Sequence, residues 1–88
     1  MNSQALARSV ELAPVIERVH GERHPELTRV RQITEQLAAS APGTDVGPLF
    51  AELRVVTGDY AIPDDVCETF VAVYESLARA EDELGVHA

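Results

Sequence analysis

The chain has 88 residues, the length of one small domain, so we treat residues 1–88 as a single unit. Its formal net charge is −8, from seven arginines, no lysine and fifteen acidic residues. This balance repels phosphate groups, so we expect the chain to bind neither nucleic acid nor an anionic membrane surface.

The N-terminal segment and the single cysteine indicate the cellular setting. The first ten residues, MNSQALARSV, lack the basic segment and apolar run of a secretory signal. No apolar stretch approaches the roughly 20 residues of a membrane span. One cysteine can form neither an internal disulfide nor a cysteine-based zinc site by itself. We therefore expect a cytoplasmic protein in a reducing environment.

The first half of the chain predicts two helices, at residues 3–20 and 25–41. Pro14 should bend the first helix, Gly21 should end it, and Pro25 suits the first turn of the second. Apolar residues recur at helical spacing in both: Leu6, Val10, Ala13 and Ile16, then Leu27, Val30, Ile33 and Leu37.

The second half predicts helices at residues 45–57 and 63–85. Pro48 fits the first turn of the third helix and Gly58 its end, while Asp64 and Asp65 suit the first turn of the fourth. The fourth helix carries a broad apolar face, which includes Phe70, Val73, Tyr74, Leu77 and Leu84.

Four helices with short connections predict an all-α fold, a short up-down-up-down four-helix bundle. The width of the apolar face on the fourth helix indicates that this helix packs against more than one neighbour. We therefore predict that Phe70, Val73, Tyr74, Leu77 and Leu84 support self-association or docking on a protein partner.

Two segments give the chain a resemblance to a known family. VHGERHPEL (residues 19–27) and LRVVTGDYAIPDDVCETFVAVYESLARAEDEL (residues 53–84) resemble the two corner regions of haemerythrin-like proteins. The closest group is the iron-sulfur cluster repair di-iron proteins. The resemblance covers about two thirds of the chain and implies a four-helix bundle that binds two irons through histidines and carboxylates.

The chain departs from that family at most of the iron ligands. The family's paired histidines of the first helix, the His-x-x-x-Glu pair of the second and the Glu-His of the third are absent. His87 matches the first histidine of the last ligand motif, whose glutamate is missing. His20 also matches a family histidine, but in that family this histidine lies about 30 Å along the helix from the paired histidines, so both cannot bind one small cluster. The resemblance thus implies a degenerate metal site. The residues that carry iron-sulfur repair in the family are absent from this chain, so that activity is not expected.

Candidate metal ligands are His20, His24 and His87, with Glu22 and Glu26 beside the first two. The alternative interpretation is structural: His20 favours the negative C-terminus of its helix, and His24 packs at the corner. We expect no resident cofactor, with iron as the alternative.

Other polar residues are interpreted structurally. Cys67 is expected to be an inert core thiol, with a thiol of lowered pKa near a helix N-terminus as the alternative. Tyr60 is expected to be a packing residue, and the acidic run 81–83 a solvated face. We recognise no nucleophile–base pair and no nucleotide-binding motif, so an enzyme is not expected. The sequence therefore predicts a non-catalytic interaction module, with iron binding or the sensing of oxygen or nitric oxide as the alternative.

Overall fold

A computed structural model describes residues 3–84 as four α-helices, with no strand in that range. The helices are α1 (Gln4–His20), α2 (Leu27–Ala39), α3 (Gly47–Thr57) and α4 (Glu68–Glu83). No helix within this range is long and apolar enough to cross a membrane.

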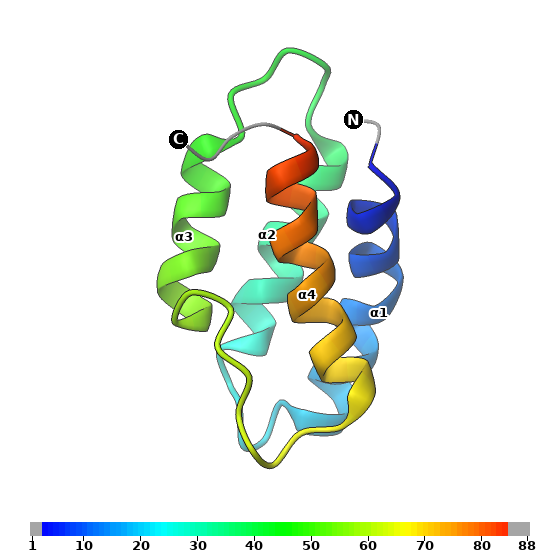
Figure 1. Cartoon of the computed structure of the whole chain (residues 1–88), viewed down its shortest axis with the longest axis vertical. Helices are drawn as coiled ribbons and strands as arrows, with labels where there is room; N and C mark the ends of the chain where they lie inside the picture. Colours follow the sequence, from blue (N-terminus) through cyan, green and yellow to red (C-terminus); the bar gives the residue numbers. More distant parts are fainter. Residues whose placement is uncertain (1–2, 85–88) are drawn as a thin grey trace.

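The helices lie side by side along the long axis of the molecule (Figure 1). The α1–α2 and α3–α4 connections lie at one end, and the α2–α3 loop lies at the other. Helix α1 packs against both α2 and α4, and α3 packs mainly on α2. Because of this arrangement, the end of α1 and the start of α4 are neighbours.

Local signals explain the bounds of α1 and the end of α3. Ser3 caps α1 by accepting a hydrogen bond from the Leu6 amide at 3.0 Å. At the other end, a Cβ on Gly21 would lie 2.3 Å from the carbonyl oxygen of Glu17, so only glycine fits there. Gly58 ends α3 in the left-handed conformation, with φ 63°.

The predicted start of α4 at residue 63 is wrong, because the helix begins at Glu68. Asp64 and Asp65 lie in a turn ahead of the helix rather than in its first turn. The carboxylate of Asp65 pairs with His24 of the α1–α2 connection, 3.1 Å from its Nε2 atom, instead of capping the helix. Cys67 becomes the N-cap residue of α4, with extended backbone angles.

The apolar residues of all four helices form one core. Four of the five predicted interaction residues belong to this core and are fully buried: Phe70, Val73, Tyr74 and Leu77. Leu84 is partly buried and packs against the same core. These side chains hold the bundle together, so they do not form an exposed surface on which a partner could dock.

A buried carboxylate joins α3, the α3–α4 loop and α4. Glu81 is 5 % exposed, and both of its oxygens accept hydrogen bonds from Nε of Arg54, at 3.0 and 2.9 Å. The hydroxyl of Tyr60 donates to the same carboxylate at 3.1 Å. The prediction of a solvated face is therefore wrong for Glu81, because two partners distant in sequence compensate its burial.

Candidate functional site

A cysteine and a histidine meet where α1 ends and α4 begins. His20 is the last residue of α1 and Cys67 is the N-cap of α4. The Nε2 atom of His20 lies 3.2 Å from the Sγ atom of Cys67. The thiol is exposed rather than in the core, so the prediction of an inert buried cysteine is wrong.

This environment favours the thiolate. The hydrogen bond with His20 is the largest cause that lowers the pKa of Cys67, to about 7, followed by the backbone amide of Phe70. The Thr69 amide adds to the effect, and burial opposes it. Amides at a helix N-terminus and an adjacent imidazole are the settings in which protein thiols become acidic. The Cys67 thiol is therefore ionised to a far greater extent near neutral pH than an ordinary thiol.

The second histidine of the corner has different partners. Nε2 of His24 lies 3.1 Å from Oδ1 of Asp65, and Nδ1 lies 3.4 Å from Oε2 of Glu26. The hydrogen bond from His24 is the largest cause that lowers the pKa of the Asp65 carboxyl. Arg23 adds a weaker ion pair to Asp65 at 3.7 Å. His24 thus links the α1–α2 connection to the turn before α4.

Both histidines pack on the same aromatic ring. The ring of Phe70 lies 5.6 Å from that of His20 and 5.5 Å from that of His24, both in edge-on geometries. Phe70 is fully buried, and the centre of its ring lies 4.5 Å from that of Tyr74. These contacts fix the orientation of the imidazoles. We call His20, His24, Asp65, Cys67 and Phe70 the corner cluster.

The donor set of the corner cluster does not fit the di-iron centre that the resemblance implies. Within residues 3–84 no group of three or more histidine, cysteine or acidic side chains is placed to hold a metal ion. His20 and His24 are turned toward separate partners, Cys67 and Asp65. His87, the third predicted ligand, lies outside the described residues.

The cysteine–histidine pair is the functional feature that sequence reasoning missed. The two residues are 47 positions apart, so no local motif contains both. A signal was nevertheless present, because an up-down bundle brings the end of its first helix to the start of its fourth. A histidine at the former and a cysteine at the latter could therefore have been paired.

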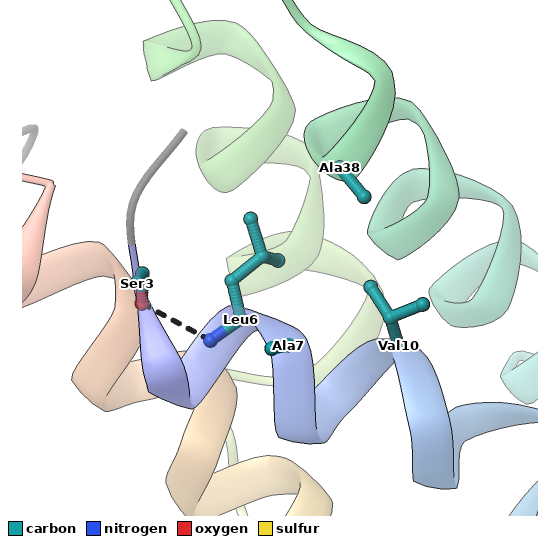
Figure 2. A pocket seen from close by; sticks show the side chains of 5 residues that line it. All are labelled: Ser3, Leu6, Ala7, Val10 and Ala38. Atoms are coloured by element: carbon teal, nitrogen blue, oxygen red, sulfur yellow. Dashed lines mark hydrogen bonds between the residues drawn. The ribbon is translucent and has the colours of Figure 1, made fainter.

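A second surface feature is an apolar hollow of about 260 Å³ between α1 and α2. Figure 2 shows Leu6 and Val10 of α1 on the side of Ala38 of α2, with Ala7 between them on α1 and the cap residue Ser3 at the start of the helix. The hollow has no charged lining residue, so it offers room for a small apolar group but no reactive group.

Comparisons of the chain with protein-family models, with curated proteins and with solved structures find no match.

Proposed function

We propose that this chain is a non-catalytic module that senses oxidants through Cys67 and responds by pairing with a second copy of itself. The observation that carries this proposal is the 3.2 Å contact between His20 Nε2 and Cys67 Sγ on the surface of the bundle. An exposed thiol with a pKa near neutrality is the form that peroxides attack.

The chemistry takes two steps. The Cys67 thiolate attacks one oxygen of a peroxide, the O–O bond breaks, and a sulfenic acid and an alkoxide or hydroxide form. The thiolate of a second chain then attacks that sulfur and expels hydroxide, which leaves an interchain disulfide. Because each chain has one cysteine, the disulfide can only join two molecules. The oxidant is the peroxide, which is reduced to an alcohol or to water.

We further propose that the bundle is haemerythrin-like, with up-down-up-down topology. The alternation of the connections between the two ends of the molecule in Figure 1 supports this assignment, as do the two corner segments quoted above. Iron binding is the alternative function. It would need donors from two chains, because His20 and His24 meet different partners within one.

Treatment of the reduced protein with a small excess of hydrogen peroxide tests the proposal, with intact mass measured under non-reducing conditions. We expect a species of twice the chain mass less two hydrogens, which a reductant converts back to the monomer. Cys67→Ser should form none of it. His20→Gln should form it several-fold more slowly, whereas His24→Gln, which leaves the thiol contact intact, should match the wild type. Equal rates of dimer formation in the wild type, His20→Gln and His24→Gln would overturn the proposal.

A further inference from the structure

Two adjoining hollows on the α1–α4 face share the side chains of Arg8, Ser76 and Arg79. Their volumes are about 290 and 280 Å³. Arg8 comes from the first half of α1, and the other two residues come from the second half of α4. Twelve helical positions separate Arg8 from His20, about 18 Å along α1, so these hollows are distinct from the corner cluster.

The two arginines have no acidic partner among residues 3–84, in a chain rich in acids. Four of the seven arginines form ion pairs with described carboxylates: Arg23, Arg29, Arg31 and Arg54. Arg8 and Arg79 form no such pair within that range, although they line the same two hollows. The surface therefore brings two arginines without an ion pair in that range to the same two hollows.

The acidic residues that line the hollows form no ion pair with these guanidinium groups. Glu83 lines one hollow, but its Oε1 accepts a hydrogen bond from Oγ of Ser3 at 2.6 Å. Glu75 lines the other hollow one helical turn before Arg79, and the two form no ion pair. Ser76 is 9 % exposed, and its hydroxyl has no hydrogen-bond partner among the described residues. Three donor groups, Arg8, Ser76 and Arg79, thus line both hollows, and none of them is paired with the carboxylates there.

We propose that Arg8, Ser76 and Arg79 bind a doubly charged tetrahedral oxyanion, such as phosphate or a phosphoryl group of a small molecule. Guanidinium groups bind such anions through paired N–H donors, and the serine hydroxyl supplies a further donor from the floor of the hollow. Because both guanidinium groups are exposed and the chain is negative overall, binding is weak, with Kd about 1–10 mM.

Titration of ¹⁵N-labelled protein with inorganic phosphate at constant ionic strength tests the site by NMR. We expect saturable shifts of the Arg8 and Arg79 side-chain Nε–H signals and of the Ser76 amide. Arg8→Gln and Arg79→Gln should each weaken binding about five- to tenfold. The matched control is Arg18→Gln, which removes the same charge from an exposed position near the other end of α1 and should change Kd less than twofold.

Several outcomes would overturn the inference. Shifts that grow linearly without saturation would indicate ionic atmosphere rather than a site. An equal loss of affinity in Arg18→Gln would indicate a general charge effect. Acetate that binds as tightly as phosphate would exclude a site selective for a doubly charged oxyanion. Circular dichroism of each variant shows whether the helices are intact, and Ser76→Ala provides a second test that leaves every charge in place.

Discussion

The imidazole of His20 and the thiol of Cys67 meet at 3.2 Å across 47 residues of sequence. One closes α1 and the other caps α4, so the contact exists only when the bundle is folded. The acidity of the thiol is therefore a property of the fold. Unfolding should return Cys67 to the pKa of an ordinary thiol, about 8.5.

This difference between the two states predicts how stability depends on pH. The folded pKa of Cys67, about 7, lies below the unfolded value, so its stabilising contribution is present above about pH 8.5 and is lost as pH falls through 7. Urea unfolding of the wild type should therefore show a small gain in stability from pH 6 to pH 9. Cys67→Ser should lack this gain, and a parallel pH dependence in both proteins would contradict the assignment.

The buried carboxylate predicts a larger effect. Glu81→Gln replaces a carboxylate that faces Arg54 and Tyr60, and the free energy of unfolding should fall by about 1–3 kcal/mol. Glu83→Gln is the matched control on the same helix, because Glu83 is exposed and, among residues 3–84, its side chain bonds only to Ser3. Its effect should stay within about 0.5 kcal/mol. Urea denaturation measures both, and equal effects would argue against a buried network.

The turn after α3 contains backbone strain that a glycine would relieve. Asp59 and Tyr60 follow Gly58 with φ of 61° each, in the left-handed region that disfavours side chains. Asp59→Gly should stabilise the protein by up to about 1 kcal/mol, since the ion pair of Asp59 with Arg54 is long and exposed. Asp59→Ala keeps a Cβ at this φ and should not stabilise. Thermal unfolding distinguishes the two variants, and equal melting temperatures would refute the argument.

The two tyrosines should resist ionisation. Burial raises the pKa of Tyr74 to about 12, and the nearby Glu26 adds to this. Burial, followed by the carboxylate of Glu81, also raises the pKa of Tyr60. Because the folded pKa values exceed the ordinary value of about 10, this stabilising contribution is lost as pH rises above 10. Absorbance at 295 nm should therefore stay nearly flat to about pH 11, and a normal titration near pH 10 would contradict these environments.

Much of the fold could be predicted because its signals are local. The cap at Ser3 and the glycines at positions 21 and 58 mark helix ends through their own backbone chemistry. The start of α4 could not be read in this way. Asp64 and Asp65 are typical helix-start residues, but Asp65 instead pairs with His24, a residue 41 positions earlier.

The candidate site depended on that same boundary. A helix from residue 63 would place Cys67 inside its first turns, whereas a start at Glu68 places the thiol at the exposed N-cap. The burial of Glu81 was hidden for a related reason, because its compensating partners, Arg54 and Tyr60, lie on the preceding helix and loop. Both misses are contacts between residues far apart in sequence, which composition and periodicity do not encode.

The rate of alkylation of Cys67 by iodoacetamide as a function of pH tests the central claim most directly. The wild type and His24→Gln should show an inflection near pH 7, and His20→Gln should shift it upward by about one unit toward that of an ordinary thiol. An inflection near 8.5 in the wild type, or one that His20→Gln leaves in place, would contradict the account.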